Sequence, residues 1–173
     1  EKKLPDNPLP FTLRGAVLLE MNDVPGARKS YERAIAINPA HFPAAERLAR
    51  LDMADKKPDD ARKRMEAILA KEPKQTQALL ALAEMRAVAG GTADEVAVLI
   101  GKAIAANPAD AMPRLVLITH YLRNKDPKKA VAAGQEAQAA IPESPEILEA
   151  LGLVPTQWAH RIRRTSVEFD GAQ

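Results

Sequence analysis

The chain has 173 residues, of which 46% are hydrophobic and only 3% aromatic, with 25 basic residues, 23 acidic residues and no cysteine. A length of this order suits one domain with a core, and abundant alanine with few aromatic residues favours packed helices over a β-sheet. The formal net charge of +2 is too balanced to predict a nucleic-acid partner or an acidic membrane surface. The lack of cysteine excludes disulfides and thiolate metal sites. No apolar run approaches the roughly 20 residues that span a bilayer, so we expect no transmembrane segment in this sequence.

Nine helices are expected from the spacing of apolar residues and from the breaks between them. Residues 1–7 are polar and predict a lead-in coil before the first helix. Thr92 and Glu95 have the spacing of a capping box, and Asp126 before Pro127 is typical of a helix start. The expected helices cover about residues 9–21, 25–37, 44–54, 59–72, 75–89, 93–107, 111–123, 127–140 and 145–153.

Prolines end every second expected helix at a regular interval. Pro39, Pro73, Pro108 and Pro142 are 34, 35 and 34 residues apart, and a proline cannot continue a helix. A fixed period near 34 residues indicates a stacked array of helix–turn–helix repeats, so we predict an all-α fold. The array is expected over residues 8–153, with repeats at 8–41, 42–75, 76–110 and 111–144, a partial fifth repeat at 145–153, and a tail without repeat spacing at 154–173.

Small residues recur at the same places in successive periods. Small side chains let two helices approach closely, which the stacking of short helices requires. No single hairpin buries its apolar face alone, so we expect the stability to come from interfaces between neighbouring hairpins. The eighth position of each period holds Gly15, Ala49, Ala83 and Ile118, with Gly152 in the partial repeat. One position in the second helix holds Ala27, Ala61, Val96 and Ala130. A second position, seven residues further on, holds Ala34, Ile68, Ala103 and Ala137.

Five residues of the first period carry a family resemblance. Gly15, Ala27, Tyr31, Ala34 and Pro39 match the tetratricopeptide (TPR) pattern, which the chain resembles over most of its length. The resemblance implies a right-handed superhelix, an α-solenoid, of about four helix–turn–helix repeats plus a partial fifth. The third repeat is one residue longer than the others, and we expect its Gly90-Gly91 turn to absorb the extra residue.

Three further stretches carry a narrower resemblance, to the TPR-repeat protein of bacterial exosortase (PEP-CTERM) and exopolysaccharide systems. They are residues 5–10, 41–45 and 107–117. Such proteins are long arrays in the cell envelope. The resemblance therefore implies that this chain is a fragment of a larger periplasmic or envelope protein that acts in protein sorting or exopolysaccharide export. The residues by themselves leave a cytoplasmic location open as the alternative.

The chain departs from the repeat pattern at one first-helix position, where the family has an aromatic or large apolar residue. Asp52 and Arg86 occupy this position in two repeats, and Pro155 occupies it in the last. Three interpretations of the tail beyond Pro155 stay open. The tail is a basic membrane or nucleic-acid tag, an unfolded native or appended extension, or a cap in which Trp158 and Ile162 cover the last helix.

No group of residues predicts catalysis, a metal site or a cofactor. His41, His120 and His160 are far apart in the sequence, and none has a second ligand at the spacing of a known metal motif. We expect His41 to be a solvated turn residue and His120 to be packed or half-exposed. Gly90-Gly91 precedes no lysine at phosphate-loop spacing. We therefore predict that the protein is not an enzyme and uses no cofactor and no metal.

The concave face of the predicted array is the expected binding site. We expect Arg50 to pair with Glu46 one turn earlier, and at least one of Met53 and Met112 to fill the core. A groove that mixes apolar and charged side chains suits an extended peptide or an amphipathic helix of another protein. The TPR resemblance places in this groove, from the first helix of each repeat, the side chains of Thr12, Leu19, Glu46, Arg50, Met53, Gln77, Leu80, Glu84, Met112, Leu115, Thr119 and Leu122.

Two functions agree with these features, and a third is disfavoured. The first is a non-enzymatic scaffold that binds a protein or peptide partner, and the alternative is a structural spacer within a long array that has no ligand of its own. Direct polysaccharide binding is disfavoured, because Phe11, Tyr31 and Tyr121 are expected in the core. We expect no nucleic-acid partner. The open end of the array near Leu148 and Leu151 predicts self-association or coverage by the tail.

Overall fold

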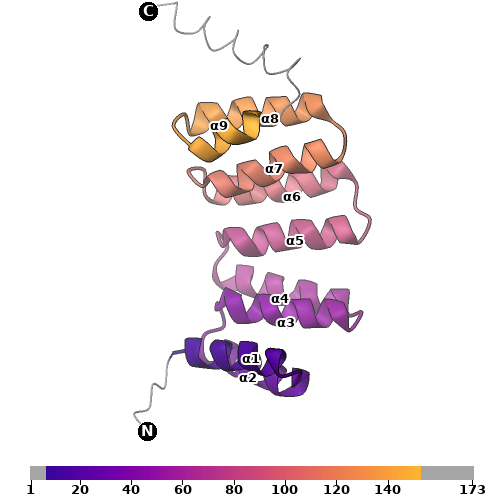
Figure 1. The fold of residues 1–173 in the computed structure, drawn as a ribbon, viewed down its shortest axis with the longest axis vertical. Helices are drawn as coiled ribbons and strands as arrows, with labels where there is room; N and C mark the ends of the chain where they lie inside the picture. The colour runs from indigo at the N-terminus through magenta and orange to yellow at the C-terminus, as the bar shows by residue number, and fades with distance from the viewer. Residues whose placement is uncertain (1–6, 153–173) are drawn as a thin grey trace, which may run out of the picture. The chain divides into compact units, whose positions relative to one another are not determined.

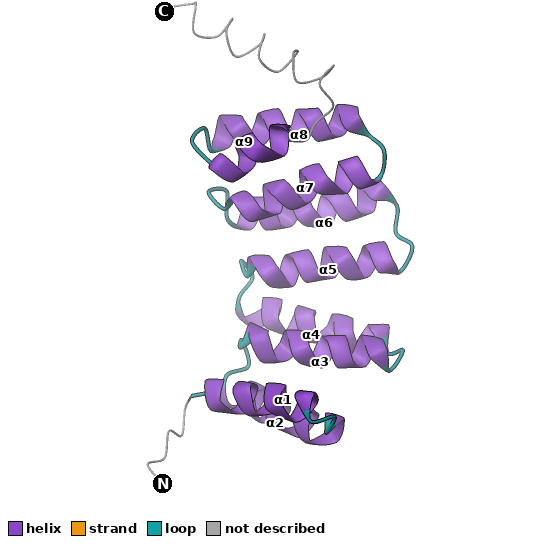
Figure 2. Ribbon diagram, in the orientation of Figure 1, coloured by secondary structure: helices purple, strands orange, loops and turns teal. Residues whose placement is uncertain are grey.

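The computed structural model describes residues 7–152, in which helices are joined by short turns and no strand occurs (Figures 1 and 2). Every helix expected from the sequence is present in this range, so the all-α prediction is confirmed. The predicted tail, residues 154–173, lies outside the described residues. The helices are α1 (Leu9–Glu20), α2 (Val24–Ile37), α3 (Phe42–Ala54), α4 (Pro58–Lys71), α5 (Thr76–Val88), α6 (Ala93–Ala106), α7 (Ala111–Arg123), α8 (Pro127–Ala140) and α9 (Pro145–Gly152).

Consecutive helices pair as hairpins, and the described residues divide into two compact units, 7–85 and 86–152, whose boundary falls inside α5. We call α1, α3, α5, α7 and α9 the first helices and α2, α4, α6 and α8 the second helices. In the first unit α1 packs against α2, α2 against α3, and α3 against α4 (Figure 1). In the second unit α6 packs against α7, α7 against α8, and both α7 and α8 against α9. The assignment of one array over residues 8–153 stays a prediction.

The turns inside the hairpins repeat one backbone conformation. Asn22, Lys56 and Lys125 have φ values of 58°, 59° and 57°, and Gly90 has a φ of 79°, so each turn places one residue in the left-handed region. Asn22, Lys56 and Gly90 are 34 residues apart, whereas Lys125 follows Gly90 by 35 residues. The extra residue of the third repeat therefore lies after Gly90. α6 begins three residues after Gly90, whereas the other second helices begin two residues after the left-handed residue of their turn. The turn between Gly90 and α6 therefore absorbs the extra residue, as predicted.

Side-chain caps fix where several second helices begin. The capping box at α6 is confirmed: Thr92 Oγ1 accepts from the backbone N–H of Glu95 at 3.3 Å, and the Glu95 carboxylate accepts from the backbone N–H of Thr92 at 2.8 Å. The Asp126 carboxylate accepts from the backbone N–H of Lys129 at 3.0 Å, which confirms the predicted start of α8. These contacts satisfy backbone donors that a helix terminus otherwise leaves without partners.

The predicted small positions lie in the cores of the hairpins. Tyr31 is fully buried, and its ring covers Gly15, the eighth residue of the first period. The same eighth position is buried in the next three repeats, and both small positions of the second helices are buried in all four repeats. At Gly15 the missing side chain leaves room for the Tyr31 ring, which lets α1 and α2 approach closely.

The structure corrects the expectation that α9 leaves both of its leucines open. Leu151 is buried in a cluster with Ile118, Val131 and Ile147, and its side chain lies over Gly134 of α8. Leu148 is 49% exposed and is the large apolar residue of α9 that faces solvent. The difference arises because α9 packs back onto both α7 and α8, which covers the side of α9 that carries Leu151.

The packing of Tyr31 on Gly15 predicts opposite effects for two glycine-to-alanine changes. A Cβ at residue 15 would lie 2.6 Å from Tyr31 Cε1, whereas nothing lies within 4 Å of a Cβ at Gly101. We expect Gly15→Ala to destabilise the protein by about 1–3 kcal/mol through overpacking. Gly101→Ala, in the interior of α6, should stabilise it by about 0.5–1 kcal/mol through helix propensity. Urea denaturation of both variants checks this, and a stabilising Gly15→Ala would contradict the packing.

Candidate functional site

The groove residues predicted in the first unit belong to α1, α3 and α5 and differ widely in exposure. Arg50 is paired with Glu46 as predicted, with 2.7 Å between Arg50 Nη2 and Glu46 Oε1, and its side chain is 69% exposed. Met53 packs against the core cluster of α3 and α4, and Leu19 packs against the cluster around Tyr31. Of the other predicted residues, Thr12 and Leu80 are half-buried, whereas Gln77 and Glu84 are exposed.

The groove residues predicted in the second unit all belong to α7. Met112 is 57% exposed and Thr119 is also exposed, whereas Leu115 and Leu122 are half-buried and pack against the core. One of the two groove methionines, Met53, therefore fills the core as expected, and Met112 remains open to solvent. The joint groove across the two units stays a prediction. Within each unit, its predicted members include side chains that are already engaged in packing.

His41 differs from the solvated turn residue that the sequence predicts. It is half-buried at the start of α3, and its Nε2 lies 2.9 Å from Thr12 Oγ1 in α1. The Thr12 hydroxyl also donates to the carbonyl of Pro8 at 3.1 Å, so a neutral His41 that carries its proton on Nε2 donates to Thr12. Burial lowers the pKa of His41, because desolvation disfavours the imidazolium. Thr12 thus joins two hairpins and is not free for a ligand.

Asp52 is a buried carboxylate held by two partly exposed arginines, an ionic cluster that sequence reasoning missed. Its carboxylate accepts a hydrogen bond from Arg28 of α2 at 2.6 Å and a second from Arg64 of α4. Arg28 also pairs with Asp55 at 2.7 Å. Burial opposes the ionisation of Asp52, but the hydrogen bonds from Arg64 and Arg28 outweigh it and lower the pKa of the carboxyl. The cluster ties α3 to the second helices on both sides of it.

The same repeat position carries polar contacts in the second unit. Arg86, the equivalent of Asp52, pairs with Glu95 of α6 at 2.8 Å. Tyr121, the next equivalent, has the ammonium of Lys129 at 5.7 Å from its ring centroid, a cation–π contact. The departure from the family pattern that the sequence shows at Asp52 and Arg86 is therefore compensated in each case by a charge on a second helix.

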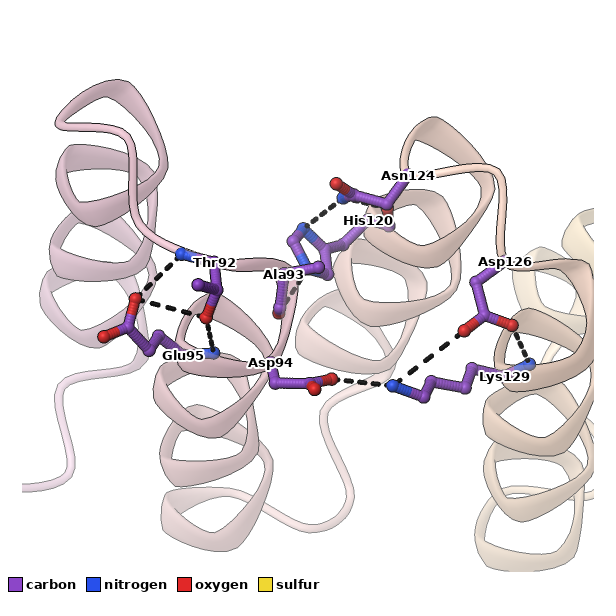
Figure 3. Close-up of polar contacts among 8 residues, drawn as sticks. All are labelled: Thr92, Ala93, Asp94, Glu95, His120, Asn124, Asp126 and Lys129. Carbon is purple, nitrogen blue, oxygen red and sulfur yellow. Dashed lines mark hydrogen bonds and ion pairs between the residues drawn. The ribbon is translucent and has the colours of Figure 1, made fainter.

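A polar cluster in the second unit connects the starts of α6 and α8 to the end of α7 (Figure 3). The His120 ring donates through Nε2 to the carbonyl of Ala93 at 2.8 Å, which confirms His120 as a half-buried packing residue. Lys129 Nζ lies 2.7 Å from Asp94 and 3.9 Å from Asp126. The hydrogen bond that Lys129 donates to the Asp94 carboxylate raises the pKa of Lys129. Because these groups are bonded to one another, the cluster is a structural connection between helices.

The described residues 7–152 hold neither a metal-ligating cluster nor a membrane-spanning helix. No three side chains of the metal-ligating types lie close enough together there to hold an ion. None of the helices in that range has both the length and the apolar character that crossing a bilayer requires.

The comparisons with known proteins agree with the observed hairpins. Two sequence profiles described as tetratricopeptide repeat match the chain, one over residues 18–85 and the other over residues 97–145. No curated protein matches the sequence. Among solved structures, a tetratricopeptide repeat protein from Parabacteroides merdae is similar with a TM-score of 0.60 and 12% identity, covering 96% of this chain and 68% of that one.

Two other similar structures cover most of both chains. A thermophilic TPR protein of Thermus thermophilus has a TM-score of 0.56 and 21% identity, covering 93% of this chain and 90% of that one. PilW, a type IV pilus biogenesis factor, has a TM-score of 0.59 and 16% identity, covering 98% of this chain and 81% of that one. At these low sequence identities the similarity concerns the fold alone, an all-helical tetratricopeptide repeat structure.

The half-buried His41 predicts a stability that falls in mild acid. Its pKa in the folded protein is below the ordinary value of 6.5, so folding favours the neutral ring. The contribution of His41 is complete above pH 6.5 and is lost as the pH falls through the lowered pKa of the folded state. The side chain of His41 makes no cap hydrogen bond at the start of α3, and His41→Asn places there a residue that suits a helix N-cap and does not titrate. We expect the unfolding free energy of His41→Asn, measured by urea denaturation between pH 7.5 and pH 5, to fall less than that of the parent protein. An equal fall of the unfolding free energy with pH in His41→Asn and in the parent protein would contradict the contact between His41 and Thr12.

Proposed function

Because the chain belongs to the tetratricopeptide repeat family, we propose that it is a non-enzymatic scaffold that binds a protein or peptide through its first helices. The observation that carries this proposal is Met112, a flexible apolar side chain that is 57% exposed at a predicted groove position. Methionine adapts its shape to irregular apolar partners, and it is frequent at surfaces that bind varied peptides. Half-buried Leu115 belongs to the same predicted groove.

Polar groups beside these apolar positions support a peptide ligand. The exposed Arg50 and its partner Glu46 lie on α3, and Glu84 and Gln77 are exposed on α5. Such groups can hydrogen-bond an extended backbone or the polar face of a helix, while the apolar positions hold its anchoring side chains. The net charge of +2 gives no electrostatic basis for nucleic-acid binding.

The cellular setting that we propose rests on the sequence resemblance alone. The stretches at residues 5–10, 41–45 and 107–117 resemble the TPR-repeat protein of exosortase and exopolysaccharide systems. We therefore propose a fragment of a larger periplasmic or envelope protein that acts in exopolysaccharide export or protein sorting, with a cytoplasmic protein as the alternative. Self-association through the exposed Leu148 of α9 is part of the same proposal.

A structural spacer without its own ligand is the second candidate. It is favoured by the packing of Leu19, Met53 and Leu122 against the cores, which leaves less of the predicted groove open. Removing residues 42–75, one whole period, separates the two candidates. A spacer tolerates this deletion, whereas a binding protein loses affinity because the groove residues Glu46 and Arg50 are removed with it.

The groove assignment predicts different results for two exposed apolar residues of the second unit. Met112 lies at a predicted groove position on α7, and Val98, which is 63% exposed, lies on the second helix α6. The probe is a peptide selected from a displayed random library against the full chain, with its Kd measured by fluorescence anisotropy. We expect Met112→Glu to weaken peptide binding at least about tenfold, about 1.4 kcal/mol. The unfolding free energies of Met112→Glu and of its control Val98→Glu should each change by less than about 0.5 kcal/mol.

Val98→Glu is the matched control, since it adds the same charge at a similarly exposed site outside the groove. Its peptide Kd should stay within about twofold of the parent value. Equal affinities for Met112→Glu and the parent protein, together with no effect of charge reversal at Arg50 and Glu84, would rule out the groove.

A further inference from the structure

The outward side of α6 is apolar, whereas the same side of two other second helices is charged. Val98 lies in the interior of α6 and is 63% exposed, and nothing lies within 4 Å of a Cβ at Gly101, three residues later. Exposed charged residues occupy the equivalent positions on α2 and α4, and α8 has a small residue and an amide there. The equivalents of Val98 are Lys29, Lys63 and Ala132, and those of Gly101 are Glu32, Glu66 and Gln135.

Four residues form one face of α6: Asp94, Val98, Gly101 and Ala105. They are spaced four, three and four residues apart, which places them on the same side of a helix. Asp94, Val98 and Ala105 are exposed, and Gly101 lies between the last two in the sequence. We call these four residues the outer face of α6. Because this spacing is typical of the seam along which two helices pack, the outer face has the form of one half of a two-helix contact.

We propose that the outer face of α6 binds the same face of a second copy of this chain, with the two helices antiparallel. In this arrangement Val98 of each copy enters the open space above Gly101 of the other, so that a large side chain packs opposite a residue without one. The same register places the small Ala105 opposite Asp94, whose carboxylate keeps its ion pair with Lys129 of its own chain. Each copy thus supplies both a projecting side chain and the space that receives it.

The charges beside the outer face favour a second copy as the occupant and set the direction of the two helices. Glu95 and Lys102 are seven residues apart and lie on the same side of α6. Two antiparallel copies bring Glu95 of each near Lys102 of the other, whereas two parallel copies would bring like charges together. Lys102 is exposed and takes part in none of the ion pairs of residues 7–152. The Glu95 side chain is bonded to Arg86 and is still 49% exposed, so it can accept a second cation.

The outer face is distinct from the surfaces proposed above. It belongs to a second helix, whereas the predicted groove residues belong to first helices and Leu148 belongs to α9. A lipid surface is a poorer occupant, because interfacial helices carry several basic residues and α6 carries one basic residue and two acidic residues. One pair of 14-residue helices buries less area than a standard protein interface, so we expect a weak dimer.

Sedimentation equilibrium of the full chain, between about 5 μM and about 500 μM, tests the contact. We expect a reversible equilibrium between monomer and dimer. Gly101→Glu introduces the charge that α2 and α4 carry at this position, and it should weaken the dimer at least about tenfold, because a carboxylate buried in the contact has no partner. The same change should not lower the melting temperature of the monomer, since the space around Gly101 is open and glutamate favours a helix more than glycine does.

Two further variants test the charges. Lys102→Glu should weaken the dimer about fivefold or more, because it makes two attractive pairs repulsive. Ala67→Glu on α4 is the matched control for Gly101→Glu, since Ala67 is exposed and the change adds the same charge to a second helix outside the outer face. Its dimer constant should stay within about twofold of the parent value.

Single thiols report the direction of the two helices, because the chain has no cysteine. In a mixture of Asp94→Cys and Ala105→Cys, mixed disulfide dimers should form at least about tenfold faster than disulfide dimers of Ala105→Cys alone. Antiparallel helices hold residue 94 opposite residue 105 and keep the two copies of residue 105 too far apart for a disulfide.

Three results would overturn the proposal. The first is a chain that stays monomeric up to about 500 μM. The second is a dimer that Gly101→Glu leaves unchanged, which would place the contact elsewhere, on α9 if Leu148→Glu abolishes the dimer. The third is a mixed disulfide that forms no faster than the disulfide of Ala105→Cys alone, which would contradict the antiparallel contact.

Discussion

The contact between each first helix and the preceding second helix is the constraint on which the rest of this structure depends. A single hairpin of two short helices buries only one side of each, so its remaining apolar side has to be covered by a neighbour. Alanine on α2 lets Leu48 of α3 approach closely enough to be fully buried, and the contact of Leu151 with Gly134 of α8 repeats this arrangement. The 34-residue period preserves these contacts, because it returns each residue type to the same place.

Charged residues enter this apolar contact where a second helix provides a partner. Asp52 stands where related repeats have a large apolar residue, and it is ionised between Arg28 and Arg64 from the helices on its two sides. Removing Arg28 or Arg64 leaves the buried carboxylate of Asp52 with less compensation for its charge, so the three side chains work as a unit. It makes the pairing of these three helices specific, because another helix in the same place would leave the carboxylate without partners.

Features set by residues close together in the sequence were predictable, and features that depend on contacts between hairpins were not. The helices, the Thr92 capping box and the turn at Gly90 follow from local signals and from the period. The bond between His41 and Thr12 joins residues 29 positions apart, and no local signal selects that partner. The exposure of the groove was predictable only in part, because its two methionines differ in their surroundings: Met112, the second residue of its repeat, stays open, while Met53, the twelfth residue of its repeat, packs against the core.

The measurement that tests the central claim most directly is hydrogen exchange, residue by residue, on Leu48→Ala. Leu48 is fully buried in the contact between α3 and α2, and its truncation should cost about 3 kcal/mol. If neighbouring hairpins stabilise one another, exchange will accelerate in α2 and α1 as well as in α3 and α4. Acceleration confined to α3 and α4, with α1 and α2 as protected as in the parent protein, would show that each hairpin is stable by itself and would contradict this account.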